Sequence, residues 1–367
     1  VSRSAVLDAH ARTHGRRALP RYHFAQAKVI VSFGADFLGS WVSPVEFTKD
    51  WAANRRPADD WDPMSWHGQF EAMMTLTGAN ADLRVPLKPS EERGALALLG
   101  ELVAERTGWT GPRGPRGAAS ARVEKALRDA ADLLAAAKGR ALVVSGSGDV
   151  STQVLVNWAN HMLGAYGATL ELARPSLQAE GDDASLSALI AELERGEVAV
   201  LVVHGVNPAH DNPAAEAFRA AAKKAGLVVS LSGVPDETTA LAHWTAPDHH
   251  ALEAWGDAEP GLGVRSLRQP AIAPLYDTRA AAETLLAWSG KPSGAYEHVR
   301  ALWRAAVFPG QKEHKDFEGF WRDALRRGAV TTAGVGRGEG RFDASSLARA
   351  AAPAEAAEPG TFEPVDY

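Results

Sequence analysis

The chain has 367 residues, of which 46% are hydrophobic and 23% charged, so it is long enough for two ordinary globular domains and too apolar for a disordered protein. Its formal net charge of −6, with basic residues spread along the chain, argues against a nucleic-acid-binding surface. The absence of cysteine excludes disulfides, thiolate catalysis and iron–sulfur ligation from this chain, and no apolar run reaches the roughly 18 residues that a membrane-spanning helix needs.

Residues 1–107 predict a first α/β unit. The apolar run Lys28–Phe33 has the composition of a buried strand, and it ends in a glycine-containing loop, Gly34–Ser40. Helices are expected over residues 1–20, 44–56 and 91–107, and a second short strand over residues 83–87. Residues 108–119 hold four glycines and two prolines, so they predict a flexible linker and the boundary of this unit.

Residues 120–290 predict a second α/β unit. Strands are expected over residues 141–144, 198–203 and 227–231, and helices over residues 121–137, 152–164, 185–195 and 214–225. Because single helices separate the strands, parallel pairing with right-handed crossovers is expected. The predicted fold class is therefore α/β, with two doubly wound, largely parallel Rossmann-like units. A helical segment, 291–330, and a mobile extension rich in Gly, Ala, Pro and Glu, 331–367, follow.

Loops that follow parallel strands meet at one edge of a sheet, where α/β proteins bind ligands, so residues 200–274 are the most informative part of the chain. Gly146 and Gly148 form only part of a dinucleotide-binding pattern, and a glycine turn explains them. The glycine-rich stretch 334–340 precedes no helix and predicts a linker. The sequence has no serine-nucleophile elbow, so no catalytic residue is assigned.

Histidines in this stretch raise the question of a metal site. His243, His249 and His250 lie close together in the sequence, with Glu253 nearby. Adjacent histidines of an irregular loop point in different directions, so a solvent-edge loop is favoured over a zinc or haem site. His204 ends a buried strand and is expected to be a hydrogen-bonded packing residue. The sequence therefore predicts no metal site in this chain.

Several segments carry a resemblance when they are taken in order. Gly205-Val206-Asn207-Pro208 follows a strand, Phe33–Asp36 follows an earlier one, and Ala81–Glu92 and Glu253–Asp257 complete the set. Together they resemble the molybdopterin-dependent oxidoreductases of the dimethyl-sulfoxide-reductase type. That family has a Gly-x-Asn-Pro loop near the guanine end of a pterin dinucleotide. It also has Gly-Thr-Asp after the proline that corresponds to Pro89, and this chain departs from the family there.

The departures resemble one branch of that family. Segments such as Met73–Asp82 and Gln269–Asp277 are similar to the large iron–sulfur subunit of bacterial alternative complex III, a quinol-oxidising respiratory complex. The resemblance covers about residues 22–288. It implies a molybdopterin-oxidoreductase-like domain without molybdenum, followed in the whole subunit by a ferredoxin-like domain that holds the clusters. The chain is then expected to be a fragment of that subunit.

The resemblance also implies a vestigial pterin-dinucleotide pocket. Its residues in this chain would be Gly34, Asp36, Gly205, Asn207, Pro208, Glu253 and Gly256. For 205–208 a structural turn is the simpler interpretation, because glycine permits a positive φ and proline fixes the next one. Trp255 and Asp257 stand where the family more often has smaller residues, so we expect the pocket to be filled by side chains.

Different functional hypotheses remain open. The first is a cofactor-free structural docking domain of a respiratory quinol:electron-acceptor oxidoreductase, peripheral on the periplasmic face of the bacterial inner membrane. The resemblance implies a multihaem cytochrome c, integral membrane quinol-binding subunits and the ferredoxin-like cluster domain as its partners. The second is a fragment of an active enzyme that holds bis-molybdopterin guanine dinucleotide, with its metal ligand outside this chain. The third is an unrelated nucleotide-binding α/β protein. If saturating NAD left the melting temperature unchanged, that result would count against this third hypothesis.

Overall fold

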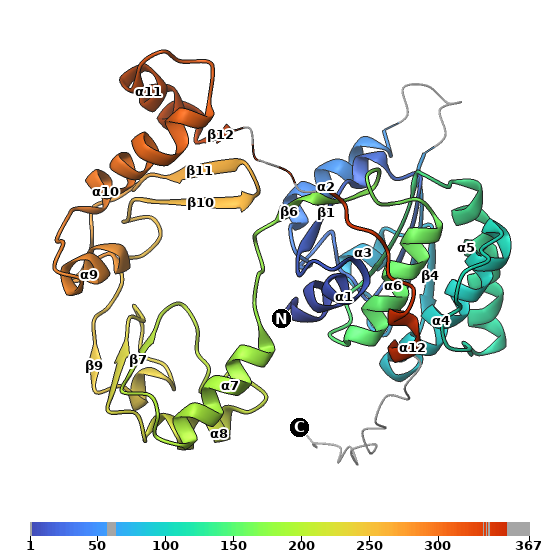
Figure 1. Cartoon of the computed structure of the whole chain (residues 1–367), viewed down its shortest axis with the longest axis horizontal. Coiled ribbons are helices and arrows are strands. Elements are labelled where there is room, and N and C mark those ends of the chain that lie inside the picture. Colours follow the sequence, from blue (N-terminus) through green and yellow to red (C-terminus); the bar gives the residue numbers. More distant parts are fainter. Residues whose placement is uncertain (1, 57–63, 333, 335, 337, 351–367) are drawn as a thin grey trace. The chain divides into compact units, whose positions relative to one another are not determined.

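The computed structural model describes residues 2–56, 64–332, 334, 336 and 338–350 (Figure 1). The chain forms two compact units. The first comprises residues up to 180 together with those from 336 onward, and the second comprises residues 181–335. Two separate parallel sheets, one in each unit, confirm the predicted α/β class with Rossmann-like units.

The first unit is built on a four-stranded parallel sheet with the order β4-β3-β2-β5. Its strands are β2 (Val29–Phe33), β3 (Trp66–Glu71), β4 (Leu83–Pro86) and β5 (Ala141–Ser145). The central strand β2 pairs with β3 on one side and with β5 on the other, and all of its residues are buried. The chain therefore moves outward from β2 to β4 and then returns to the opposite side of β2. The strand order reverses between β2 and β5, and such a reversal is the usual ligand position in these sheets.

Helices cover both faces of this sheet. The helices that precede residue 180 are α1 (Ser4–His14), α2 (Pro44–Ala53), α3 (Leu76–Ala79), α4 (Pro89–Thr107), α5 (Ala121–Ala136) and α6 (Val150–Met162). Val29 and Val31 pack with α4, α5 and α6 on one face. Ile30 packs on the other face with residues of α1 and α2 and with aromatic side chains, and a short 3₁₀ turn, η1 (Phe24–Gln26), supplies one of them. This alternation follows from the two-residue repeat of a strand, and it places an apolar layer on each side.

The predicted linker 108–119 is irregular, but it does not separate two units. Strand β5 follows it and pairs with β2, so both sides of the linker belong to one sheet. The linker also packs closely on α4 and α6. A Cβ atom at Gly114 would lie 2.8 Å from Cζ3 of Trp158, and one at Gly117 would lie 1.9 Å from the backbone nitrogen of Leu98. The glycines there permit close packing, and the predicted domain boundary at 108–119 is wrong; the units divide near residue 180.

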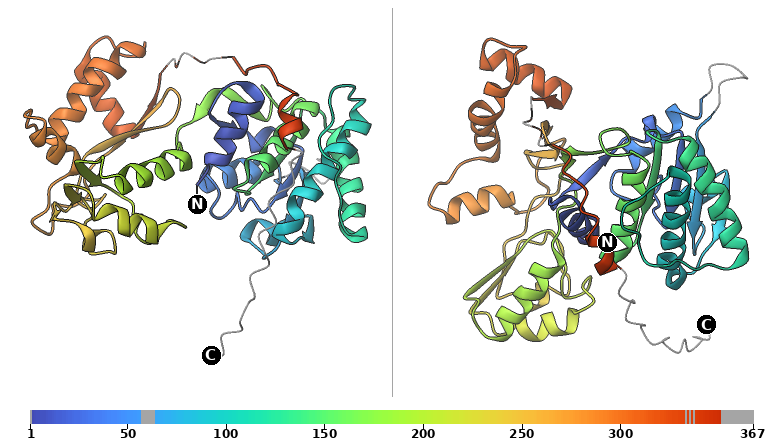
Figure 2. Two further views of the ribbon diagram at one scale, coloured as in Figure 1. Left: turned by 60° about the horizontal axis from the view of Figure 1, so that its bottom comes forward. Right: turned by 45° about the vertical axis from the view of Figure 1, so that its right-hand side comes forward.

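The residues that follow the second unit return to the first, where they form an ordered segment. Strands β1 (Leu19–Tyr22) and β6 (Leu170–Ser176) form an antiparallel pair, and the Glu339 carboxylate accepts hydrogen bonds from two backbone N–H groups of β6. Phe342 stacks on His161, and Leu347 in α12 (Ser346–Ala350) is buried. Figure 2 shows α12, in red, beside α6. The prediction of a mobile extension over 331–367 is therefore wrong for residues 338–350 and for Thr331, which ends a strand, and residues 333, 335, 337 and 351–367 lie outside the described residues.

The second unit begins with a smaller parallel sheet. Its strands, in the order β7-β8-β9, are β7 (Val200–Val203), β8 (Leu227–Ser230) and β9 (Trp244–Thr245). Helices α7 (Asp183–Glu194) and α8 (Ala215–Ala222) pack against it around Leu193, Leu201 and Phe218. Apolar positions on one side of each helix account for this packing. The predicted strands and helices of 185–231 are confirmed, with small shifts at their ends.

An antiparallel ribbon and a helical cluster complete the second unit. Its elements are η2 (Thr239–Leu241), β10 (Gly256–Gly261), β11 (Val264–Arg268), α9 (Ala281–Trp288), α10 (Ala295–Leu302), η3 (Trp303–Val307), η4 (Phe308–Gly310), α11 (Phe317–Arg327) and β12 (Ala329–Thr331). Strand β11 pairs with β10 and with β12. Trp303, Phe320 and Trp321 form an aromatic core where α11 packs on η3, and the helices α10 and α11 lie within the range 291–330. None of the described helices has both the length and the apolar content required to cross a membrane.

Candidate functional site

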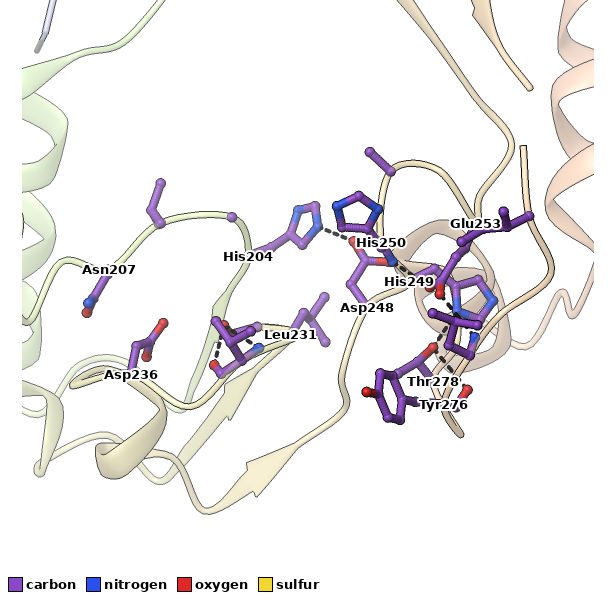
Figure 3. Close-up of a pocket in the computed structure, with 18 of the residues that line it drawn as sticks. His204, Asn207, Leu231, Asp236, Asp248, His249, His250, Glu253, Tyr276 and Thr278 are labelled. Atoms are coloured by element: carbon purple, nitrogen blue, oxygen red, sulfur yellow. Dashed lines mark hydrogen bonds and ion pairs between the residues drawn. The ribbon is translucent and has the colours of Figure 1, made fainter. Parts of the chain in front are cut away.

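The candidate site is a cavity of about 680 Å³ in the second unit (Figure 3). It lies beyond the carboxyl ends of β7, β8 and β9, where the loops after parallel strands converge. Four chain segments line it: 204–211, 231–236, 248–253 and 272–278. Its volume is within the range of about 300–1,000 Å³ typical of small-molecule sites.

Asn207 joins the loop after β7 to the loop after β8. Its side-chain amide donates to the Glu237 carboxylate over 2.7 Å, and its carbonyl oxygen accepts from the backbone N–H and the hydroxyl of Thr238, at 3.2 and 2.6 Å. The hydroxyl oxygen of Thr238 in turn accepts from the backbone N–H of Ala209. Gly205, with a φ of 69°, makes the turn that brings Asn207 into this position. The polar atoms of Asn207 are thus engaged within the protein.

Glu253 likewise joins two loops, on the opposite wall of the cavity. One carboxylate oxygen accepts from the backbone N–H of His250 at 2.9 Å, and the other accepts from that of Leu275 at 3.0 Å. These backbone hydrogen bonds lower the pKa of the Glu253 carboxyl, which is therefore ionised at neutral pH. Glu253 connects the third and fourth segments of the cavity wall.

A histidine–aspartate pair joins the loop after β7 to the loop after β9 (Figure 3). Nε2 of His204 lies 2.9 Å from a carboxylate oxygen of Asp248, whose second oxygen accepts from the backbone N–H of Ala281 at the start of α9. His204 is exposed, so the expectation that it is a packing residue is wrong, although the expected hydrogen bond is present. His249 contacts the Thr278 hydroxyl at 2.6 Å. The sequence did not indicate the pairing of His204 with Asp248, because 44 positions separate them.

The charge of the cavity is negative. Four of its lining residues are acidic, namely Asp211, Asp236, Asp248 and Glu253, and none of the lining residues described is lysine or arginine. Hydrogen bonds from the backbone and side chain of Thr239 lower the pKa of Asp236. The donor set therefore does not fit the pyrophosphate of a pterin dinucleotide, which would require cationic or backbone donors aimed at it.

Trp255 does not fill the cavity. Its ring packs on Tyr296 with a centroid distance of 4.9 Å, and its neighbour Asp257 accepts a hydrogen bond from the Trp303 indole. Neither residue lines the cavity, so the expectation of a pocket filled by these side chains is wrong. Gly256 lies in β10, where an added Cβ would be 3.0 Å from the Arg268 guanidinium. The structure thus places Gly205, Asn207 and Glu253 at the cavity, and Pro208 directly after Asn207, but not Gly256.

Gly34 and Asp36 belong to the first unit. Gly34 has a φ of 58°, and the Asp36 carboxylate accepts from the backbone N–H and the hydroxyl of Thr77, at 3.1 and 2.8 Å. Asp36 therefore ties the loop after β2 to α3. A Cβ on Gly146 would lie 2.4 Å from the carbonyl oxygen of Gly34, so the loops after β2 and β5 meet there in backbone contact.

Glu92 is a residue of this region that the sequence did not indicate. Its carboxyl accepts a hydrogen bond of 2.6 Å from the Ser145 hydroxyl at the end of β5, and burial raises its pKa. It lines a small cavity of about 230 Å³ beside Gly34. Its position three residues after Pro89, where the resembled family has an aspartate, is the signal that could have identified it.

One cluster in the second unit has the composition of a metal site. Ligand-type atoms of Glu313, His314 and Asp323 lie within 4.8 Å of one another. Arg327 binds both carboxylates, and Arg326 also binds Asp323. The hydrogen bond from Arg326 is the largest cause that lowers the pKa of Asp323. An ion-pair network explains the cluster without a cation.

Comparisons with known proteins bear on the fold. No family model matches the chain. The chain is similar to a menaquinone reductase, molybdopterin-binding-like subunit, from Nitratidesulfovibrio vulgaris, with 25% identity over 306 residues that cover 74% of this chain and 44% of that protein. It is also similar to the solved structure of acetylene hydratase from Pelobacter acetylenicus, with a TM-score of 0.50 and 14% identity over 90% of this chain and 55% of that one. The chain thus spans about half the length of each of these relatives, and the second similarity concerns the fold alone.

Proposed function

We propose that this chain is the molybdopterin-oxidoreductase-like part of a subunit in a quinone-linked respiratory complex, and that it serves there as a structural docking domain without a cofactor of its own. The coarse assignment rests on the curated relative, which is named as a menaquinone reductase subunit and as molybdopterin-binding-like. The finer proposal is a complex of the alternative complex III type, with the chain on the periplasmic face of the membrane. Its partners there would be a multihaem cytochrome c, quinol-binding membrane subunits and a ferredoxin-like cluster domain.

One observation carries the cofactor-free part of the proposal. The residues that match the pterin-dinucleotide motifs use their polar atoms to hold loops together: Asn207 binds Glu237 and Thr238, and Glu253 binds two backbone N–H groups. Asp36 does the same in the first unit. Side chains engaged in this way stabilise the loops whether or not a ligand is present. The acidic lining of the cavity points in the same direction, because it repels a pyrophosphate.

A second function is favoured by one specific observation, the open cavity of about 680 Å³ beside Asn207. A site of this size is compatible with an active pterin-dependent enzyme, in which residues outside this chain would supply the metal ligand and the cationic donors. Bis-molybdopterin guanine dinucleotide would be the cofactor in that case. A carboxylate such as Asp236 could accept from a guanine base, whose edge carries hydrogen-bond donors.

Measurement of molybdenum and pterin in the full-length protein distinguishes the two functions. The protein is purified with its complex from its own host, and a molybdoenzyme purified from the same cells is the positive control. The proposal predicts background molybdenum by mass spectrometry and no fluorescence from oxidised pterin, while the control contains both. About one molybdenum per chain, together with pterin fluorescence, would contradict the cofactor-free proposal and establish the second function.

A further inference from the structure

The mouth of the cavity in the second unit carries large apolar side chains that face solvent. Leu275 is 71% exposed and Tyr276 is 79% exposed, and Val206, Val234 and Ile272 are also exposed. All five line the cavity. Single exposed apolar residues are ordinary, but several that surround one concave site are typical of a surface that another molecule covers.

Acidic side chains line the same cavity. The Asp211 carboxylate makes no hydrogen bond or ion pair with the residues that the structure describes, and it is exposed. Asp236 and Glu253 accept backbone hydrogen bonds but keep their negative charge. No lysine or arginine among the described residues lies in the lining, and His204, one of its histidines, pairs with Asp248 rather than with Asp211, Asp236 or Glu253. A concave site with charges of one sign attracts the opposite charge over several ångströms.

We infer that this cavity binds a segment of a partner subunit in which lysine or arginine is flanked by apolar residues. The inference rests on the proposed docking function and names the chemistry of the partner at that site. The basic side chains of the segment would enter the cavity toward Asp211 and Asp236, and its apolar side chains would cover Leu275 and Tyr276. A volume of about 680 Å³ accommodates several side chains of such a segment.

Other occupants fit these observations less well. Residues 351–367 of this chain contain four acidic and no basic residues, so their charge has the same sign as the cavity. Anionic lipid headgroups and nucleic acids would be repelled for the same reason. A basic and apolar polypeptide complements both the acidic and the exposed apolar side chains of the lining.

A peptide-binding assay on the full chain tests the chemistry. The probe is a short fluorescein-labelled peptide in which arginines alternate with leucines, and two matched peptides carry glutamate for arginine or serine for leucine. Fluorescence anisotropy should show the arginine–leucine peptide binding at least about tenfold more tightly than either matched peptide. Its affinity should also fall as salt is raised, because the charges at the cavity are accessible to ions. Equal affinity for the three peptides would overturn the inference.

Variants locate the binding to the cavity. The double variant Asp211→Lys, Leu275→Ser changes two exposed side chains at the cavity, and Glu194→Lys, on α7 outside the lining, is the control matched for the aspartate-to-lysine charge change. We expect the double variant to lose about tenfold or more in affinity and the control to stay within about twofold. Thermal unfolding of all three proteins checks that each is folded. A folded double variant that binds as the wild type does would overturn the inference.

Purification of the native complex separates failure of this inference from failure of the proposed function. The tagged wild-type protein, the double variant and the control are each purified from detergent-solubilised membranes of the host, and co-purifying subunits are quantified. Loss of subunits from the double variant alone supports cavity docking. Full retention of subunits by a folded double variant refutes docking at this cavity while the proposed subunit role stands. A wild-type protein that purifies alone, with bound pterin, refutes both.

Discussion

Replacement of Asn207 by alanine removes the side chain that joins the loops after β7 and β8. The carbonyl oxygen of Asn207 accepts two hydrogen bonds from Thr238, which is only 2% exposed. A buried backbone N–H left without an acceptor costs about 1–3 kcal/mol, and the lost hydroxyl hydrogen bond adds about 1 kcal/mol, so the variant should be less stable by about 2–4 kcal/mol. The contact with the exposed Glu237 adds little.

Equilibrium urea unfolding of the full chain measures this loss, with far-ultraviolet circular dichroism as the signal. Hydrogen exchange locates it: the amides of Ala209 and Thr238 should exchange much faster in Asn207→Ala, while those of β2 in the first unit stay protected. Glu237→Gln is the matched control, because it keeps an acceptor for the Asn207 amide and removes only an exposed charge. It should unfold at nearly the same urea concentration as the wild type.

The opposite pattern would refute the structural interpretation of the Gly-x-Asn-Pro loop. An Asn207→Ala variant with wild-type stability and unchanged exchange would show that the loops do not depend on this side chain. If the same variant also lost molybdenum or pterin from the complex, Asn207 would be a ligand-binding residue, and this result would support the active-enzyme function.

Three further predictions concern the first unit. Gly146→Ala places a Cβ 2.4 Å from the carbonyl oxygen of Gly34, so it should lower the free energy of unfolding by about 1–3 kcal/mol in denaturant titration; wild-type stability would disprove the close contact. Leu347→Ala should lower the free energy of unfolding by about 2–5 kcal/mol and speed proteolysis near residue 340. If the C-terminal segment did not pack on the first unit, the substitution would change neither quantity. Burial lowers the pKa of His10 to about 4, so the unfolded chain takes up a proton at a higher pH than the folded chain does. The free energy of unfolding should therefore fall by up to about 3 kcal/mol as the pH drops from about 6.5 to 4. In denaturant titrations at several pH values, His10→Gln should make this decline less steep, and an unchanged slope would contradict the prediction.

Predictions from the sequence succeeded where local patterns control the structure. The apolar runs at β2, β5, β7 and β8 are strands. In β2 and β5 every residue is buried, because strands covered on both faces of a parallel sheet must be apolar in succession. In β7 alternate valines are exposed, so its apolar run reflects strand propensity rather than burial on both faces. The Gly-x-Asn-Pro motif correctly predicted a turn with a positive φ at Gly205. Strand β3 was missed, because Trp66–Glu71 includes His67, Gly68, Gln69 and Glu71 although the strand is almost wholly buried. Hydrogen bonds among these polar side chains and with Arg84 satisfy Gln69 and Glu71, whereas the buried Nδ1 of His67 has no partner among the described residues; no local pattern reveals such contacts.

The limits of the units and the state of the cavity depended on contacts between distant residues. The glycines of 108–119 have the composition of a flexible linker, yet they allow the chain to pack against Trp158, so composition alone could not distinguish a linker from a close-packed segment. The bulky Trp255 suggested a filled pocket, but its ring packs on Tyr296 instead. The direction of a side chain depends on the tertiary packing around it.

The sequence by itself determined the α/β class, the succession of most strands and helices, and the positions of the loops that carry Asn207 and Glu253, since hydrophobic periodicity and turn residues act over short distances. Only the tertiary structure decided that these side chains hold loops together, that His204 meets Asp248, and that acidic and exposed apolar side chains line one open cavity. These properties arise where loops from separate strands converge at one sheet edge, and residues far apart in the chain become neighbours only when the sheet forms.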